Sequence, residues 1–283
     1  MSRSMNRVVF IADFFSDQIP GGGELNNEEL IDILRGSGHK VEKKNCHRVD
    51  KDFIRKNSNS WFIISNFVNL SEEVKLLLQD KKYVIYEHDH KYLKSRNPAL
   101  YENYHAPPSE IINFDFYKSA LAVICQSKFH EEIVKKNLKL NNITNIGGNL
   151  WSSDILDFLE EICKTEKKNV YSIMNSSINH KNTSDAVRYC RYNNFEYELI
   201  PALQYKDFLE RLGANKFLIF LPKTPETLSR IAVEARMMGM SVVTNKNVGA
   251  SKEEWFSLKG MELIDVMRSK RSDIPKKILD AFK

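Results

Sequence analysis

Two glutamates, Glu226 and Glu234, stand out in a segment that otherwise predicts an ordinary packed helix. The stretch 225–245, PETLSRIAVEARMMGMSVVTN, predicts a helix that leads into a buried strand. At 100° per residue its apolar side chains form one stripe, and Glu234 lies on the border of that stripe. A helix would separate the two carboxylates by about 12 Å along its axis.

The two carboxylates have different structural explanations. Glu226 falls at the first turn of the predicted helix, where a carboxylate complements the helix dipole, so a purely structural role stays open for it. Glu234 lacks this explanation. A half-buried carboxylate needs hydrogen-bond partners, and the hydroxyl groups of a ligand are good ones.

A glycine-rich turn follows the first predicted strand. Gly21, Gly22 and Gly23 precede Glu24 and a predicted helix. Glycines let the backbone approach a ligand closely, and the helix N-terminus offers N–H groups to a phosphate. The spacing matches neither GxGxxG nor a P-loop, so a flexible turn stays the alternative.

Five polar residues, EHDHK at 87–91, follow another predicted strand. His88, Asp89, His90 and Lys91 at a strand end favour contacts with a sugar or an acceptor. The alternation of His88 and His90 suggests a metal site as one alternative. No third ligand is evident, however, and the spacing matches no zinc signature. A surface turn is the remaining alternative.

A lysine follows the first predicted strand of the second half. Lys181 lies at the start of a predicted helix, where a cation is not needed to complement the dipole. A bound pyrophosphate would explain it, and a solvated lysine is the alternative. Ser127 is explained as a helix N-cap.

Composition sets the class of protein. Hydrophobic residues make up 42% and charged residues 28% of the 283 residues, which favours a packed core over disorder. The net charge of +5 permits an anionic partner without requiring one. The four cysteines form no CxxC pair, and no signal peptide or membrane span is evident, so we expect a cytoplasmic protein without a span.

Strands and helices alternate along the whole chain, and the pattern restarts after about residue 165, which predicts two α/β domains with parallel sheets. We expect an N-terminal domain at 1–150, a linker at 151–167, a second domain at 168–270 and a C-terminal helix at 271–283. Ligands of such sheets bind beyond the carboxyl ends of the strands.

Together these motifs make the chain resemble the GT-B glycosyltransferases, in particular the large retaining family 4. That family has a Gly-Gly-x-Glu-like loop after its first strand, matched here by Gly22, Gly23 and Glu24. Its E-x7-E motif is matched by Glu226 and Glu234, and SVV at 241–243 continues it.

One part of the family pattern is matched only in part. Lys181 lies where a Lys-Gly pair is usual, but Asn182 replaces the glycine, and the expected arginine a few residues earlier is absent. The chain is also shorter than typical members, and stretches of its sequence resemble short glycosyltransferases of tailed bacteriophages.

The resemblance implies a GT-B fold of two Rossmann-like domains and a nucleotide-diphosphate sugar as donor, with a UDP-sugar expected and no obligatory metal. It implies transfer with retention, in which Glu234 holds the ribose, Lys181 the diphosphate, and Glu226 with the backbone of Thr227 and Leu228 the donor sugar. We expect Glu234→Ala to weaken donor binding and leave the fold intact.

The acceptor side is implied in the first domain. The glycine loop would approach the phosphates and acceptor, and His88 or Asp89 would face the sugar and acceptor, with Glu24, His90 and Lys91 beside them. A hydroxymethylated base in phage DNA, flipped from its helix, is one acceptor. A glycan, lipid or protein acceptor is the alternative, as is a non-catalytic nucleotide-binding protein on the same scaffold. The oligomeric state is open.

Overall fold

A computed structural model describes residues 7–19 and 21–283. Its contacts divide the chain into two compact units, each of which is described by itself. Unit 1 runs to Leu150 and takes in Arg271–Lys283, and unit 2 is Trp151–Lys270.

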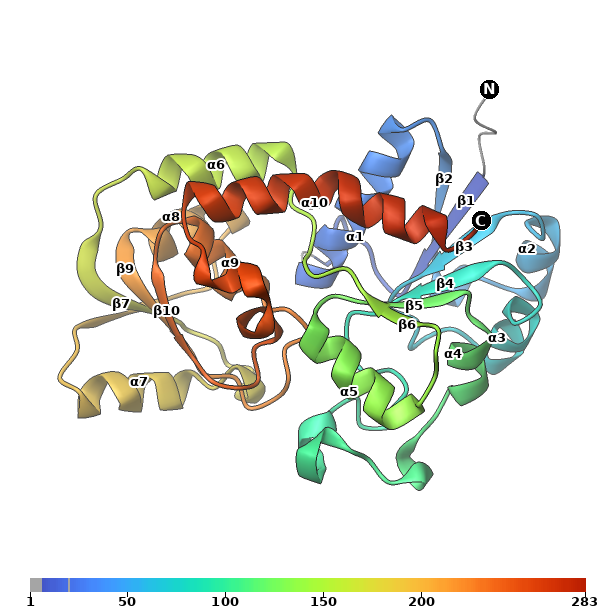
Figure 1. Ribbon diagram of the computed structural model, residues 1–283, viewed down its shortest axis with the longest axis horizontal. Helices are drawn as coiled ribbons and strands as arrows, with labels where there is room; N and C mark the ends of the chain where they lie inside the picture. Colours follow the sequence, from blue (N-terminus) through green and yellow to red (C-terminus); the bar gives the residue numbers. More distant parts are fainter. Residues whose placement is uncertain (1–6, 20) are drawn as a thin grey trace. The chain divides into compact units, whose positions relative to one another are not determined.

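Unit 1 contains one six-stranded sheet, and all of its neighbouring strands are parallel. The strand order is β2-β1-β3-β4-β5-β6 (Figure 1). The elements are β1 (Arg7–Ala12), α1 (Gly22–Gly36), β2 (Lys40–Asn45), α2 (Lys51–Lys56), β3 (Trp61–Ile64), α3 (Glu72–Leu78), β4 (Tyr83–Tyr86), α4 (Phe114–Ser119), β5 (Ala122–Cys125), α5 (Lys128–Leu138) and β6 (Ile143–Asn145).

Both faces of this sheet are covered, because successive side chains of a strand point to opposite faces. Along β1, Val8 and Phe10 pack in one apolar cluster with α1 and the end of α10, while Val9 and Ile11 pack in another with α2, α3, α4 and α5. Burial on both faces explains why the inner strands β1, β3, β4 and β5 are short apolar runs, whereas the edge strand β2 is mostly polar.

Unit 2 contains a four-stranded parallel sheet in the order β10-β9-β7-β8. Helices α6, α8, α9 and the start of α10 cover one face, and α7 covers the other. The elements are α6 (Ser153–Cys163), β7 (Lys168–Met174), α7 (Thr183–Tyr192), β8 (Tyr197–Ile200), α8 (Tyr205–Gly213), β9 (Asn215–Phe220), α9 (Arg230–Met237), β10 (Ser241–Thr244) and α10 (Met261–Asp280). The predicted class, α/β with two parallel sheets, is confirmed.

Two predicted segments need correction. The linker expected at 151–167 is mostly helix α6, which Ser152 caps by accepting a hydrogen bond from the Ile155 N–H. Its Leu156 and Leu159 are fully buried in the unit 2 core, so the polar residues around them are only the solvated face of a helix. The C-terminal helix expected at 271–283 is the last part of the longer α10, which starts in unit 2 and ends in unit 1.

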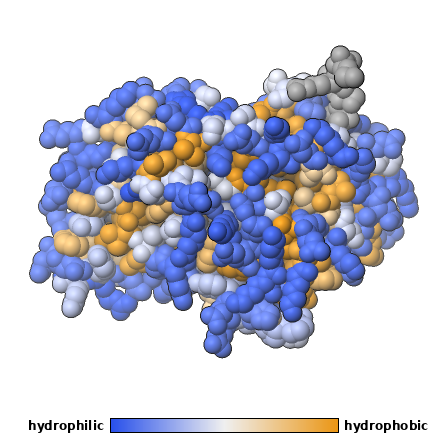
Figure 2. Space-filling view, in the orientation of Figure 1, coloured by the Kyte–Doolittle hydropathy of each residue, from blue (hydrophilic) through white to orange (hydrophobic). Residues whose placement is uncertain are grey.

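The surface seen in Figure 2 is mostly hydrophilic, with apolar residues between the polar ones. Among the described residues, no helix is long and apolar enough to cross a membrane.

Candidate functional site

In unit 2, two of the predicted site residues meet beyond the carboxyl ends of neighbouring strands. Lys181 follows β7 and Glu226 follows β9, and these two strands are adjacent in the sheet. The Lys181 Nζ lies 2.7 Å from the Glu226 Oε1. Both side chains keep some exposure, 26% and 17%, so the pair is accessible to a ligand.

Glu226 does not lie in a helix, and this corrects the sequence prediction. Helix α9 begins only at Arg230, because Ser229 before it adopts a left-handed conformation with φ of +79°. Glu226 instead forms a parallel bridge with Val248. Its backbone N–H donates to the Asn247 carbonyl at 2.7 Å, so the two glutamates do not share one helix and the helix-dipole explanation for Glu226 no longer applies.

Asn182, next to Lys181, stands where the family pattern has a glycine. Its φ is +62°. Glycine adopts this left-handed conformation most readily, and asparagine adopts it more readily than most other residues. The departure from the family pattern therefore preserves the backbone turn that places Lys181 ahead of α7.

Glu234, on α9, is 3% exposed. Its Oε1 accepts hydrogen bonds from the Trp151 Nε1 at 2.9 Å and the Tyr205 hydroxyl at 2.6 Å, and the Arg230 Nε lies 3.4 Å away. Burial and the neighbouring Glu234 raise the pKa of Tyr205, which keeps its hydroxyl a donor. A buried carboxylate is stable here because two hydrogen bonds and the positive charge of Arg230 converge on one of its oxygens.

Thr227 and Leu228 connect the two glutamates. Thr227 is half-buried, but Leu228 is fully buried in the apolar core of unit 2. The carbonyl of Leu228 already accepts from the Ala250 N–H at 2.9 Å. The Leu228 side chain is therefore a packing residue, and any contact of Leu228 with a donor has to come from its backbone.

In unit 1, the residues after β4 form a buried network of charges. The Lys91 Nζ lies 2.7 Å from the Glu87 Oε1 and 2.6 Å from the Asp89 Oδ1. Tyr117 donates its hydroxyl hydrogen bond to the Glu87 Oε2. Glu87 is fully buried, so these partners provide the stabilisation that water would give an exposed carboxylate.

The charges of this network shift its pKa values in directions set by burial and by Lys91. Burial raises the pKa of Glu87, and the attraction of Lys91 only partly opposes it. At Asp89 burial acts in the same direction, but the attraction and hydrogen bond of Lys91 outweigh it and lower the pKa to about 2. Asp89 is therefore a carboxylate at neutral pH.

His88 is held in one orientation by its neighbours. Its Nε2 lies 2.6 Å from the Asn27 Oδ1, and the Gln126 side-chain amide is bonded to its Nδ1. With the Asn27 oxygen as acceptor and the Gln126 amide as donor, this arrangement assigns the ring proton to Nε2 and leaves Nδ1 as the acceptor. A Cβ on Gly23 would lie 3.5 Å from the His88 Cγ, so this glycine packs directly against the ring.

The remaining residues of the glycine turn form the start of α1, with Gly21 as its N-cap. Gly22 is exposed and Glu24 is half-buried. The Glu24 Oε1 accepts from the Asn66 Nδ2 at 2.9 Å, which ties the first turn of α1 to the loop after β3.

His90 and Lys91, predicted to lie on the acceptor side, are both buried in the structure. His90 is 2% exposed, and its Nδ1 lies 3.0 Å from the Tyr92 hydroxyl. Burial lowers the pKa of His90 to about 4, so the ring is neutral inside unit 1. The ammonium of Lys91 is already bound by two carboxylates, as described above. Both residues hold the loop together instead of facing solvent.

Other parts of this arrangement were missed at the sequence level. Glu87 was grouped with the loop but given no role, although a charged residue directly after an apolar strand was a usable signal. Trp151 and Tyr205 reach Glu234 from distant positions in the sequence, whereas Arg230 lies four residues earlier on α9 and also packs over the Trp151 ring at 4.3 Å. No local motif indicates such a cluster. In the described part of the chain, no three His, Cys, Asp or Glu side chains are grouped to hold a metal ion.

No protein-family model matches the sequence, and none of the curated proteins matches it. Solved structures match across almost the whole chain. One is Anabaena Alr3699/HepE in complex with UDP and glucose, with a TM-score of 0.54, 12% identity, and coverage of 98% of this chain and 92% of that one.

Two other structures of similar fold have different partners. An alpha-glucosyltransferase in complex with UDP and a 13-mer DNA containing a HMU base matches with a TM-score of 0.51 and 13% identity, over 99% of this chain and 95% of that one. The catalytic domain of Arabidopsis thaliana starch synthase IV, bound to ADP and acarbose, matches with a TM-score of 0.56 and 10% identity, over 99% and 94%. At these identities the likeness establishes a GT-B-like fold.

Proposed function

We propose that this protein is a glycosyltransferase that transfers a sugar from a nucleotide-diphosphate sugar, with UDP as the nucleotide, to an acceptor hydroxyl with retention of configuration. The observation that carries the proposal is the meeting of Lys181 and Glu226 beyond adjacent strands of unit 2, on the same unit as the buried Glu234 cluster. Ligands of open α/β sheets bind at this end of the strands.

We assign to Lys181 the role of stabilising the leaving diphosphate. The reaction breaks the bond between the anomeric carbon and the diphosphate and forms a bond to the acceptor oxygen, which loses its proton. The departing diphosphate gains charge, so a cation placed beside it lowers the barrier. The half-exposed Lys181–Glu226 pair leaves the ammonium able to turn from Glu226 to a phosphate oxygen.

The ribose is the part of the donor that we assign to Glu234. Its three contacts all engage Oε1. A pair of ribose hydroxyls would donate to Oε2, and the donors at Oε1 would hold the carboxylate in a fixed orientation. Glu226 and the backbone of Thr227 would then meet the donor sugar.

His88 and Asp89 are assigned to the reacting sugar and acceptor in unit 1. His88, now bonded to Asn27 and Gln126, would exchange one of these partners for a sugar hydroxyl, and the ionised Asp89 would carry negative charge near the positive sugar of the transition state. Gly22 and Gly23 would let the start of α1 approach the phosphates, with Glu24 fixing that turn.

A hydroxymethylated DNA base is the first acceptor candidate, and a glycan, lipid or protein hydroxyl is the alternative. The structure in complex with UDP and DNA, which has a similar fold, favours it. Titration with duplex DNA at increasing salt tests it, because binding through phosphates weakens steeply with salt. A non-catalytic nucleotide-binding protein is the remaining alternative.

The decisive experiment is incubation with UDP-, GDP- and ADP-sugars, measuring binding by calorimetry and slow hydrolysis by nucleotide release. We expect a UDP-sugar to bind and to be hydrolysed slowly without an acceptor. Binding without hydrolysis or transfer would support the non-catalytic alternative. If no sugar nucleotide binds, the proposal is wrong.

A further inference from the structure

A pocket in unit 1 lies beside the loop that holds His88 and Asp89 and is not explained by the donor site. Its volume is about 460 Å³, within the range of small-molecule sites. The lining residues come from the segments after β3 and β4, from α3 and from the residues before α4: Phe67, Val68, Glu72, Lys75, Lys91, Leu93, Lys94, Arg96, Ile112 and Asn113.

Two of the cations at this pocket are only loosely engaged. The side chains of Lys94 and Arg96 are 55% and 53% exposed. The Lys94 Nζ lies 3.8 Å from the Glu110 Oε1, and the Arg96 Nη1 lies 3.5 Å from the Asp89 Oδ2. Exposed pairs at such distances contribute little to stability, so an anionic ligand can replace these partners at small cost.

The other two cations are committed to the fold. The Lys75 Nζ donates to the Glu72 Oε1 and, at 2.7 Å, to the Asn113 Oδ1. Lys91 is buried between its two carboxylates. Only Lys94 and Arg96 therefore remain to bind a ligand, and each contributes a full positive charge.

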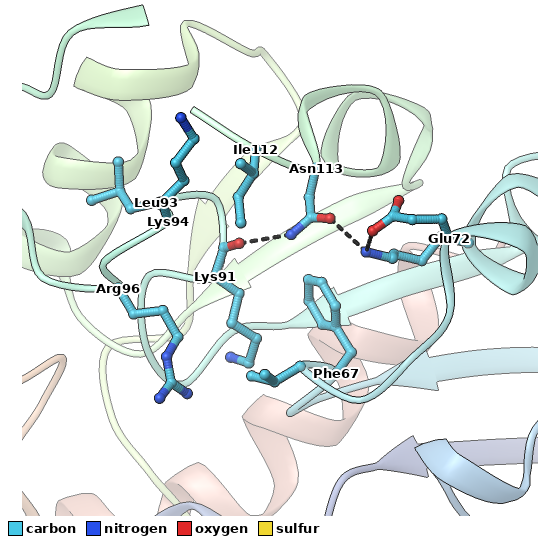
Figure 3. Close-up of a pocket in the computed structure, with 10 residues that line it drawn as sticks. Phe67, Glu72, Lys91, Leu93, Lys94, Arg96, Ile112 and Asn113 are labelled. Atoms are coloured by element: carbon cyan, nitrogen blue, oxygen red, sulfur yellow. Dashed lines mark hydrogen bonds and ion pairs between the residues drawn. The ribbon is translucent and has the colours of Figure 1, made fainter. Parts of the chain in front are cut away.

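Apolar side chains lie between these charged groups. Phe67 and Leu93 are buried, and Val68 and Ile112 are exposed enough to contact a ligand. Figure 3 shows Phe67 and Ile112 in the middle of the view, with Lys94 and Arg96 at its edge. A ligand that fits this lining combines an anionic group with a less polar body.

The backbone holds Arg96 in an uncommon conformation. Its φ is +53°, and its N–H donates to the Leu93 carbonyl at 3.1 Å. A left-handed conformation carries a steric cost for a non-glycine residue, and such residues cluster at ligand sites. Glycine would remove this cost, so the guanidinium has a reason to be kept here.

The charge of the surrounding chain argues against a nucleic-acid backbone as the ligand. Residues 7–150 contain 20 lysines and arginines and 19 aspartates and glutamates, a net charge of +1. Binding a chain of phosphates relies on an extended basic surface. Two cations at one bounded pocket suit a single phosphate group better.

We propose that this pocket binds the phosphate of a small phosphorylated acceptor, a sugar-phosphate ester, with Arg96 and Lys94 on the phosphate and the sugar body against Val68 and Ile112. The planar guanidinium matches a phosphate with two parallel hydrogen bonds. This inference rests on the proposed transferase function, since the phosphate would hold the acceptor beside Asp89.

The test measures binding of glucose, glucose 6-phosphate, glucose 1-phosphate, inorganic phosphate and a 13-mer DNA duplex by calorimetry in the absence of donor. Transfer from UDP-glucose to each sugar is measured separately. The variants are Lys94→Gln with Arg96→Gln, and as matched control Arg55→Gln, whose side chain is 64% exposed and pairs only within α2.

We expect one of the two sugar phosphates to bind at least about tenfold more tightly than glucose and inorganic phosphate, and the double variant to lose about tenfold or more of that affinity. The Arg55→Gln control should match the wild type. The proposal is overturned if glucose or inorganic phosphate binds as tightly as the sugar phosphates. It is also overturned if the double variant binds the sugar phosphates as tightly as the wild type. DNA binding that depends on Lys94 and Arg96, without sugar-phosphate binding, assigns the pocket to nucleic acid. Sugar-phosphate binding is measured without donor, so its failure is distinguishable from a failure of the proposed function. The latter would appear as loss of UDP-glucose binding and hydrolysis.

Discussion

Glu234 illustrates how the structure changes the meaning of a single residue. From the sequence it was a carboxylate without partners, whose removal was expected to leave the fold intact. In the structure it accepts from Trp151 and Tyr205 and faces Arg230, all inside the core of unit 2. Removal of this buried carboxylate would leave the Trp151 and Tyr205 donors without their acceptor and Arg230 without its ion-pair partner.

We therefore predict two effects of Glu234 variants. Glu234→Ala should lower the free energy of unfolding by about 1–3 kcal/mol, because buried donors lose their acceptor. Glu234→Gln retains an acceptor oxygen, so it should unfold closer to wild type and still bind UDP-glucose about tenfold or more weakly, through loss of a charge-assisted hydrogen bond to the ribose. Calorimetry and urea unfolding measure both. Unchanged donor affinity in the Gln variant would remove Glu234 from the donor site.

Lys181 should behave in the opposite way, with a large effect on transfer and a small one on stability. Lys181→Gln removes the charge beside the leaving diphosphate, so we expect kcat to fall by about a hundredfold. Its pair with Glu226 is partly exposed, so the free energy of unfolding should change by less than about 1 kcal/mol. Steady-state kinetics and thermal unfolding test this.

Lys223 is the matched control for Lys181. It lies on the same end of unit 2, is exposed, and donates to the Asn179 Oδ1 at 3.0 Å. Lys223→Gln should leave kcat within about twofold of wild type. A similar loss of kcat in both variants would show a general charge effect and not a role on the diphosphate.

At the scale of elements, the segment after β4 makes the fold sensitive to pH. Burial lowers the pKa of His90 to about 4 and lowers that of His130, whose ring packs 5.1 Å from it. Asp89 and Lys91 face His90 with opposite effects. A histidine with a depressed folded pKa contributes stability above its unfolded pKa of about 6.5, and loses it as the pH falls toward the folded value.

We therefore predict that the two histidines contribute a decrease in the free energy of unfolding as the pH falls from 7.5 to 5, which the raised pKa of Glu87 opposes. His90→Phe removes one of the two titrations and keeps an aromatic ring in the same place, so the decrease should be smaller in this variant. Urea unfolding at pH 7.5, 6 and 5 measures the difference. An identical decrease in wild type and variant would mean that His90 does not titrate on unfolding.

The elements that the sequence predicted well are those with a strong local pattern. The apolar strands and the amphipathic α1, α5 and α8 depend on spacing within one segment. Helix α6 was missed because Glu160, Glu161 and the lysines after it are typical of a linker, while its apolar side chains are three residues apart. The start of α9 was misplaced because the left-handed Ser229 has no signal in the sequence.

From the sequence, the site residues could be located only as polar residues that follow predicted strands. Lys181 and Glu226 were each found as polar residues after a strand, but their contact depends on β7 lying beside β9, which the chain order does not state. The burial of His90 was not predictable, because a run of polar residues at 88–91 does not tell which side chains turn inward. The loop is organised by Lys91, whose two carboxylate partners come from the same turn.

At the scale of the whole molecule, the last residues of the chain belong to the core of unit 1. Ile274, Ile278 and Phe282 are buried among β1, β3, β4 and α1. The Phe282 ring stacks on Trp61 at 4.8 Å with an interplanar angle of 4°. The first 150 residues therefore do not contain all of the apolar surface that their own sheet requires.

Removal of this tail should accordingly destabilise unit 1. We predict that Phe282→Ala lowers the free energy of unfolding by about 3 kcal/mol or more, as is usual for a buried phenylalanine. A chain that ends at Lys270 exposes the face of the sheet covered by α10, so it should aggregate or unfold below the wild-type temperature. Lys283→Gln is the control, because its side chain is 70% exposed and pairs only with Asp280. Equal stability of Phe282→Ala and Lys283→Gln would mean that the tail is not part of the core. Since we assign UDP-sugar binding to unit 2, the Phe282→Ala protein should still bind UDP-glucose at temperatures where it is folded.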